Sequence, residues 1–243
     1  NLARPALGSM AQWSSLEVPD PDRHPRLLYF REALRGLVRN HGHDTIIMAP
    51  ILGPMDLPIM IFGLEGWLAT VMSAPDDVRR VLDVTGPFFL QMVDALLADG
   101  SQALVLPSAF LLPNIVTRGL AEDVVVPALR DIYARLPQPV ILHAVGAPFG
   151  AHLDLVAQLP NVAGAVLDEG EDLAAARRTL GDARLLFGGL DGGLLRRRTP
   201  DDVRESTRSI LRERREDPRF LFTAVGPDIA WQTPPAHIHA IQE

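Results

Sequence analysis

The sequence predicts an α/β fold of the (β/α)8 TIM-type barrel class, in which parallel strands are surrounded by helices. Three observations support this prediction. Strand-like and helix-like segments alternate six times along the 243 residues. The strand-like segments are apolar throughout, as is typical of parallel strands that helices cover. Polar side chains gather where these segments end, and in a barrel those ends form the face that carries the active site.

The six strand-helix units follow an amphipathic helix expected at residues 26–40. The predicted strands are 44–51, 101–109, 139–146, 162–169, 183–191 and 219–226. The predicted helices that follow are 57–72, 75–97, 117–135, 149–159, 172–181, 199–216 and 233–242. An open doubly wound sheet is the alternative for such a pattern. No Gly-x-Gly-x-x-Gly segment follows the first strand, so a dinucleotide-binding sheet is not supported.

The N-terminal segment and the helix starts carry separate signals. Residues 1–25 are rich in proline and lack periodicity, which predicts an extended arm before a single barrel domain at 26–243.

Helix-capping side chains are expected where a Ser or Thr precedes a helix that begins with Pro. The expected capping residues are Ser73, Thr199 and Thr233.

Composition excludes several classes of protein. The net charge of −7 at pH 7 argues against a nucleic-acid partner. The chain has no cysteine, so disulfides, thiolate metal ligands and cysteine nucleophiles are excluded. Prolines interrupt the most apolar stretch, 46–62, so no membrane span is predicted. A cytoplasmic protein is the expectation.

Candidate functional residues lie at the ends of the predicted strands. They are Ser108, His143, Asp168, Glu169, Asp191 and Asp228. His143 and Glu169 are the candidate catalytic residues, because an imidazole and a carboxylate at a barrel mouth can exchange protons. The other four are candidates for binding the substrate. The alternative is structural: a buried histidine hydrogen-bonded to its surroundings, and carboxylates that stabilise helix N-termini or line a polar surface.

Two further histidines, His237 and His239, lie in the last predicted helix and are expected on its surface. Ser108 has no evident base beside it in the sequence, so no serine nucleophile is expected.

Five segments occur in an order and spacing that resemble one known family. They are APILGPMDLPIMIFGLEGW (49–67), VILHAVG (140–146), GAVLDEGEDLAAARRTLGD (164–182), LFGGLDG (186–192) and AVGPDIAWQTPPAHIHAI (224–241). Together they resemble motifs of the uroporphyrinogen decarboxylase superfamily, which includes methyltransferases of the methylcobamide:coenzyme M type. Met55 and Asp56 depart from the family's Gly-Pro-aromatic-Thr motif, in which the corresponding pair is an aromatic residue and Thr.

The resemblance implies a zinc site that this chain lacks the residues to form. In the related methyltransferases a His-x-Cys pair and a later Cys hold the metal. His143 matches the histidine, but Val145 and Pro227 stand at the two cysteine positions. Cys-ligated zinc is therefore not expected. The lesser alternative is a harder metal held by His143, Glu169 and Asp228.

The decarboxylases of the family imply a different, metal-free template. It has an Arg-rich segment for substrate carboxylates and an Asp on an early strand, and neither has a match in residues 1–43. The late histidine of that template falls at Pro227. The family's barrel has eight strands and the pattern here supplies six, so the first two are expected to be missing from this chain. We expect them to belong to a preceding segment, because an open barrel exposes strand edges.

The resemblance implies a methyltransferase-like enzyme that handles a small methylated compound or a corrinoid-linked methyl group at the C-terminal barrel face. Asp191 matches a position that orients the substrate. A corrinoid would reach the site through the substrate or through a corrinoid protein partner, and a homodimer is one expected assembly. The alternatives are a carboxy-lyase that acts on a tetrapyrrole, and a non-catalytic barrel that binds a ligand or partner subunit.

Overall fold

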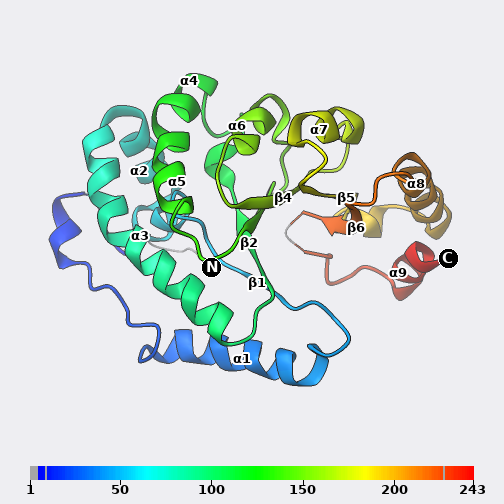
Figure 1. The fold of residues 1–243 in the computed structure, drawn as a ribbon, viewed down its shortest axis with the longest axis horizontal. Helices are drawn as coiled ribbons and strands as arrows, with labels where there is room; N and C mark the ends of the chain where they lie inside the picture. The colour runs from blue at the N-terminus through cyan, green and yellow to red at the C-terminus, as the bar shows by residue number, and fades with distance from the viewer. Residues whose placement is uncertain (1–4, 9, 227) are drawn as a thin grey trace.

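Six parallel strands form one curved sheet in the computed structural model, which describes residues 5–8, 10–226 and 228–243 (Figure 1). The strands lie in the sheet in chain order, and each pairs in parallel with the next. They are β1 (Met48–Pro50), β2 (Ala103–Pro107), β3 (Val140–His143), β4 (Val162–Val166), β5 (Leu185–Asp191) and β6 (Phe220–Val225). This confirms the predicted class, as a curled half-barrel that contains six of the eight strands of a TIM-type barrel.

Helices cover the convex side of this half-barrel (Figure 1). The α-helices are α1 (Pro25–His41), α2 (Leu57–Ser73), α3 (Pro75–Ala98), α4 (Arg118–Leu120), α5 (Val126–Tyr133), α6 (Leu153–Ala157), α7 (Leu173–Leu180), α8 (Pro200–Glu213) and α9 (Pro235–Gln242). Short 3-10 turns are η1 (Met10–Ser15), η2 (Ala109–Leu111), η4 (Gly150–His152) and η5 (Leu195–Arg197), and η3 (Ala121–Val125) is a π-helical turn. Each predicted strand-helix unit is present.

The strands are apolar on both faces because one face packs under the helices and the other forms an apolar cluster on the concave side. Successive side chains of a strand point to opposite sides. Leu142, Ala165 and Leu186 point outward into the main core under the helices. Their neighbours Ile141, Val166 and Phe187 form a second cluster with Val225 on the concave side. Burying a side chain of this size contributes roughly 1.5–3 kcal/mol, which explains why these strands read as continuous apolar runs.

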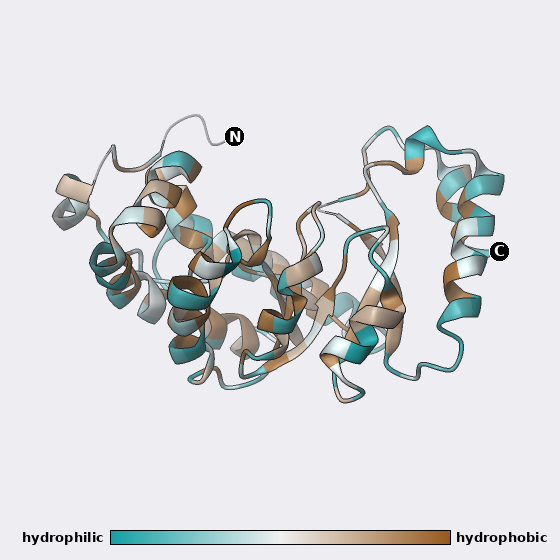
Figure 2. Ribbon diagram, turned by 90° about the horizontal axis from the view of Figure 1, so that it is seen from above, coloured by the Kyte–Doolittle hydropathy of each residue, from teal (hydrophilic) through white to brown (hydrophobic). Residues whose placement is uncertain are grey.

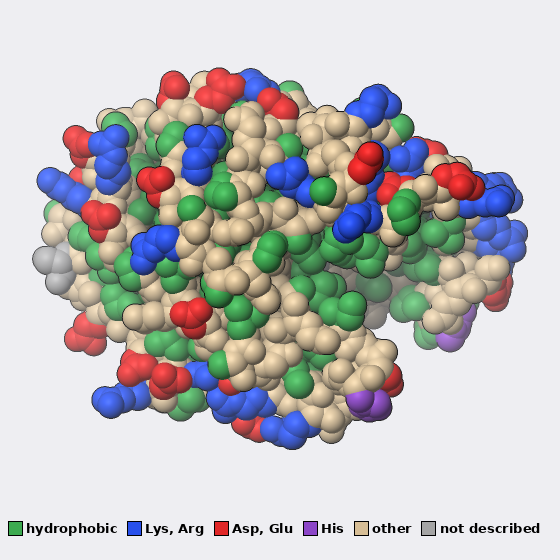
Figure 3. Space-filling model, viewed as in Figure 1, with side chains coloured by type: hydrophobic (Ala, Val, Ile, Leu, Met, Phe, Trp, Pro, Cys, Tyr) green, Lys and Arg blue, Asp and Glu red, His purple; other side chains and the backbone are tan. Residues whose placement is uncertain are grey.

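The half-barrel is open between β1 and β6. Among the described residues no strand pairs with the outer edge of either strand. Met48 of β1 is 43% exposed and Leu221 of β6 is 39% exposed. The concave side holds a cavity of about 270 Å³, and Figure 3 shows a hollow with hydrophobic side chains on its walls. The cavity is lined by Met48, Val105, Ile141, His143, Val166, Phe187, Leu221, Phe222, Thr223 and Ala224.

Helix α3 is, within the described ranges, the one helix long and apolar enough to cross a membrane. Its apolar side chains lie on one face and are buried, with Val81, Phe89, Val93 and Leu96 at most 1% exposed. In Figure 2 hydrophobic segments lie toward the interior and hydrophilic segments lie on the outer loops and helix faces. These contacts identify α3 as a core helix of the barrel.

The N-terminal arm is attached to α2 where that helix breaks. Gly63 has a φ of 76°, which interrupts the helix and leaves the carbonyl oxygen of Ile61 free to accept from outside. The amide nitrogen of Leu7 donates to that oxygen at 2.8 Å. The ring of Trp13 lies 5.7 Å from that of Phe62, so the arm also packs against the core.

Of the three predicted helix caps, the structure confirms one and contradicts two. Ser73 does not cap α3: its hydroxyl donates to the carbonyl of Ala69 one turn back in α2, and Ala74 is the N-cap. Thr233 does not cap α9, whose N-cap is Pro234. Thr199 does cap α8, in a reciprocal capping box with Asp202.

The surface position predicted for His237 is wrong, whereas His239 is exposed as expected. His237 is buried because it lies one turn before Ala240, on the face of α9 that packs against α8. Ala240 enters the small core formed by Leu190, Leu195 and Val203.

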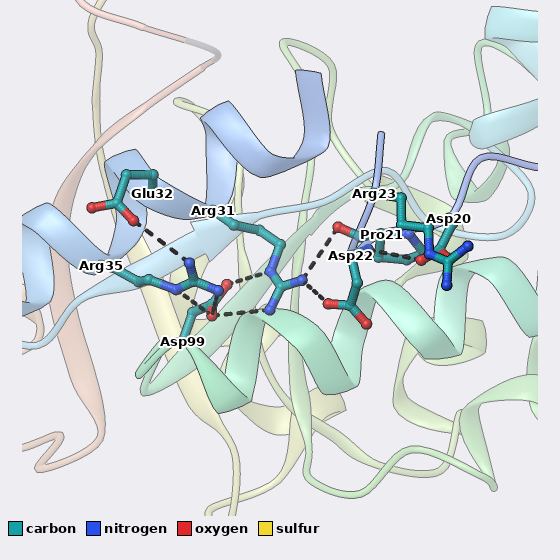
Figure 4. A network of polar contacts seen from close by, with 8 residues as sticks. All are labelled: Asp20, Pro21, Asp22, Arg23, Arg31, Glu32, Arg35 and Asp99. Atoms are coloured by element: carbon teal, nitrogen blue, oxygen red, sulfur yellow. Dashed lines mark hydrogen bonds and ion pairs between the residues drawn. The ribbon is translucent and has the colours of Figure 1, made fainter. Parts of the chain in front are cut away.

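A buried ionic network joins the arm, α1 and the end of α3 (Figure 4). Nε of Arg31 donates to Oδ2 of Asp99 at 2.5 Å, and Nη2 donates to Oδ1 at 3.1 Å. The same guanidinium also donates to Asp22 and to the carbonyl oxygen of Pro21. Arg35 donates to Asp99 Oδ1 at 2.7 Å. These helices and loops lead into strands, so the network lies at the end of the barrel opposite to the strand C-termini.

Candidate functional site

His143 occupies the last position of β3, between Pro107 of β2 and Val166 of β4 in the register. It lies two residues after Ile141 and therefore points to the same concave side, where it lines the cavity. Its Nδ1 is buried, and it has no hydrogen-bond partner among the described residues. Among the residues that line the cavity, His143 is the titratable one, and it lies at the strand end that forms the mouth of the cavity.

Burial lowers the pKa of His143, although the backbone at Ala144, the negative charge of Asp168 and the backbone at Gly226 act in the opposite direction. The imidazole is therefore predominantly neutral at pH 7. A neutral imidazole can accept a proton at one nitrogen and donate from the other.

Asp168 follows β4 on the same face of the sheet. Burial raises the pKa of Asp168, and the negative charges of Asp191 and Glu169 raise it further. A hydrogen bond from the backbone of Glu169 and the nearby His143 partly oppose this rise. An imidazole with a lowered pKa thus faces a carboxyl with a raised pKa, a pairing typical of proton exchange.

Glu169 joins the ends of β4 and β5. Its Oε2 accepts the backbone N–H of Asp191 at 2.7 Å, and its Oε1 accepts from Nη2 of Arg198 at 2.6 Å. Both side chains of the Glu169–Arg198 pair are about three-quarters buried. Because both carboxylate oxygens are engaged, this geometry favours a positioning role for Glu169. Its predicted role in catalysis stays a prediction.

Asp191 ends β5 and lies against the glycine that follows β6. Its Oδ1 accepts the backbone N–H of Gly193 at 2.8 Å. Gly226 has a φ of 85°, and a Cβ at that position would approach Oδ1 of Asp191 to 3.1 Å. Only glycine combines this backbone conformation with the close approach of the carboxylate.

The remaining candidates lie at the rim or inside the wall. Ser108 is buried, and its hydroxyl donates to the carbonyl oxygen of Leu106 at 2.8 Å. Asp228 is exposed. The structure therefore brings Asp168 within electrostatic reach of His143, Asp191 and Glu169. Pro227, which stands at a family ligand position, lies outside the described residues.

The residues present do not fit the zinc of the related methyltransferases. Val145 is apolar, and the chain has no cysteine. Across the part of the chain that the structure describes, no three His, Asp or Glu side chains are placed to hold a metal ion. The alternative set of His143, Glu169 and Asp228 is therefore not assembled, and we derive no step through a metal.

Two residues that matter to this face escaped the sequence analysis. Glu171 is partly buried, and its carboxylate accepts the backbone N–H groups of Gly150 at 2.9 Å and Asp168 at 3.0 Å. Burial raises the pKa of Glu171. Its place three residues after Asp168 is the usual spacing for a side chain that closes a loop, which was the available signal. Arg198 stood in a run of three arginines with nothing to distinguish it.

Comparison with known proteins supports the resemblance. A family model described as uroporphyrinogen decarboxylase (URO-D) matches residues 1–243. The chain belongs to the uroporphyrinogen decarboxylase family. No curated protein matches this URO-D family chain.

Among solved structures, the URO-D family chain is similar to a methyltransferase from Methanosarcina mazei, with a TM-score of 0.83 and 16% identity. That match covers 97% of this chain and 68% of the methyltransferase chain. A dihydrodipicolinate synthase from Acinetobacter baumannii, crystallised with pyruvate, matches at 16% identity with a TM-score of 0.38. It covers 87% of this chain and 66% of that one. At this identity the methyltransferase match establishes a shared fold.

Proposed function

We propose that this URO-D family protein is a methyltransferase-like enzyme that works without Cys-ligated zinc on a small methylated compound or a corrinoid-linked methyl group. The observation that carries the proposal is the pairing of His143 with Asp168 at the mouth of an apolar cavity of about 270 Å³. The fold shared with a methyltransferase supports it.

The pair can supply the proton that methyl transfer from an uncharged donor requires. When a methyl group leaves a nitrogen, sulfur or oxygen atom, the bond to carbon breaks and that atom keeps the electron pair. A new bond forms between the methyl carbon and the acceptor. An amine or sulfide that departs from an ammonium or sulfonium ion leaves neutral, whereas the departing atom of an uncharged amine, thioether or ether takes up a proton. His143, as a transient imidazolium that Asp168 stabilises, would donate it. The apolar walls keep bulk water from the methyl group.

The charge on this face favours a cationic substrate. Asp168, Asp191 and Glu169 gather at neighbouring strand ends, and only Glu169 is paired with a described cation, Arg198. A methylated ammonium or sulfonium group would gain electrostatic stabilisation here. A tetrapyrrole rich in carboxylates would be repelled, so the structure disfavours the carboxy-lyase alternative that the family name suggests.

A corrinoid would enter as the methyl carrier of a partner protein or as part of the substrate. His143 lines the cavity on the concave side, where the methyl group would have to reach it. A homodimer and a cytoplasmic location stay predictions of the sequence.

The test is a binding and transfer experiment. Calorimetric titration with tetramethylammonium, with neutral tert-butanol as the matched control, should show binding of the cation alone. Incubation with ¹³C-trimethylamine and cob(I)alamin should release dimethylamine, followed by NMR. His143→Ala should abolish transfer while leaving the thermal midpoint nearly unchanged.

Other outcomes separate the alternatives. Carbon dioxide release from a uroporphyrinogen would establish the lyase. Absence of both reactions, with a ligand still bound, would establish a non-catalytic barrel. A large loss of stability in His143→Ala would identify His143 as a core histidine.

A further inference from the structure

Asp56 is a buried carboxyl that the proposed mechanism does not use. It lies between β1 and α2 and is 6% exposed. It makes no capping hydrogen bond to α2, although it occupies the N-cap position. Its Oδ1 instead accepts the backbone N–H of Ala109 at 2.8 Å. Ala109 begins η2, the turn that follows β2, so the carboxyl holds a segment 53 residues away.

No cation among the described residues contributes to the pKa of Asp56. Met55, Trp67 and Phe110 are fully buried around it. The phenol of Tyr133 in α5 senses the charge of Asp56. Burial and the charge of Asp56 raise the pKa of Tyr133 above its ordinary value.

The second carboxylate oxygen lies among other oxygens beside Gly53. A Cβ built at Gly53 would lie 3.7 Å from Oδ2 of Asp56, 3.7 Å from the carbonyl oxygen of Pro107 and 3.6 Å from the hydroxyl of Tyr133. An ionised Asp56 would hold its negative charge here with only the backbone N–H groups of Ala109 and Phe110 as partners and no counter-ion among the described residues.

An ion buried without a counter-charge is costly, and a carboxyl in that position keeps its proton. Burial raises the pKa of Asp56 to about 7, even though the backbone N–H groups of Ala109 and Phe110 act to lower it. The protonated and ionised forms are therefore both accessible near neutral pH.

We propose that Asp56 is held as a neutral carboxylic acid that positions the turn after β2, and that loss of its proton loosens this turn. The turn is attached directly to the candidate site. Pro107 pairs with His143 in the sheet, and the amide nitrogen of Ser108 donates to the carbonyl oxygen of His143 at 3.1 Å. That this turn affects catalysis rests on the proposed function, whereas the protonation of Asp56 does not depend on it.

Amide hydrogen exchange of residues 109–111 between pH 5.5 and 8.5, expressed as protection factors, tests the proposal. In the unmodified protein, protection should fall by about tenfold between pH 5.5 and pH 7 and level off above pH 7, because opening returns the pKa of Asp56 to its lower, ordinary value. Asp56→Asn keeps one acceptor and one donor but cannot ionise, so its protection should stay flat. Asp94→Asn, which removes an exposed carboxyl, should behave as the unmodified protein.

Flat protection in the unmodified protein, or an equal fall in Asp56→Asn, would overturn the proposal. If Asp56→Asn does not fold, ¹³C NMR of the Asp56 carboxyl in the unmodified protein decides: a midpoint near 7 supports it and a midpoint near 4 contradicts it. Neither measurement needs a substrate, so its failure leaves the proposed function standing. In the transfer assay, Asp56→Ala should lose activity, and Asp56→Asn should restore it without the alkaline decline.

Discussion

Arg31 and Asp99 form a two-point ion pair at the end of the barrel opposite to the candidate site (Figure 4). Both side chains are more than 90% buried. Burial by itself raises the pKa of Asp99, but hydrogen bonds from Arg31 and Arg35 hold it below the ordinary value. The pair ties α1 to the end of α3. Because it lies far from the candidate site, its loss should affect the stability of the fold and not the chemistry at that site.

Replacing Arg31 should destabilise the protein strongly. Arg31→Met leaves Asp99 buried with Arg35 as its remaining partner, and breaking such a pair costs about 3 kcal/mol or more. Urea unfolding measures the loss. Arg23→Met, at a side chain that is 87% exposed, is the matched control and should change the unfolding free energy by less than about 0.5 kcal/mol. Equal effects of the two substitutions would show that the network does not stabilise the fold.

Gly226 and Gly181 allow backbone strain to be separated from an effect on the site. Both have a positive φ, 85° and 75°, so alanine is strained at either position by about 1 kcal/mol or more. A Cβ at Gly226 meets Asp191 at 3.1 Å, whereas nothing lies within 4 Å of a Cβ at Gly181. Both variants should lose similar stability in thermal unfolding, but only Gly226→Ala should weaken tetramethylammonium binding. Equal tetramethylammonium binding by the two variants would show that Asp191 does not contribute to the binding site.

His143 should make stability depend on pH on the acid side of neutrality. Its pKa in the folded protein is lowered by burial, so the unfolded chain takes up the proton first as pH falls. The contribution is complete above about pH 6.5, the ordinary histidine value, and is lost as pH falls through the folded pKa. His143→Gln should flatten this part of the curve of unfolding free energy against pH. His239→Gln, at an exposed position, should leave the curve unchanged.

The strands could be predicted because each is covered on both faces. Ile141 and Leu142 point in opposite directions yet both are buried, so the segment reads as an apolar run. His143 could be predicted to lie at a strand end because it is the polar residue that follows this apolar run. The partnership of Glu169 with Arg198 could not be predicted, since it joins two loops 29 residues apart through the curvature of the sheet.

Local signals failed where tertiary contacts took over. Ser73 has the sequence context of a cap, but α2 continues through it and supplies an acceptor one turn back. His237 lies in a helix with a weak apolar pattern, and its burial depends on how α9 packs against α8. Asp56 stands among prolines and apolar residues, and its protonation follows from neighbours contributed by α2, η2 and α5.

The order of the strands has a consequence for how the molecule assembles. Each strand pairs only with the strands that come next to it along the chain, and the first and last do not meet. Every pairing can therefore form as soon as its second strand has left the ribosome, without waiting for a distant segment to return. Each step must still close a crossover between parallel strands, which is slower than forming a hairpin. A chain shortened after α7 should keep the pairings from β1 to β4 and lose only those of β5 and β6.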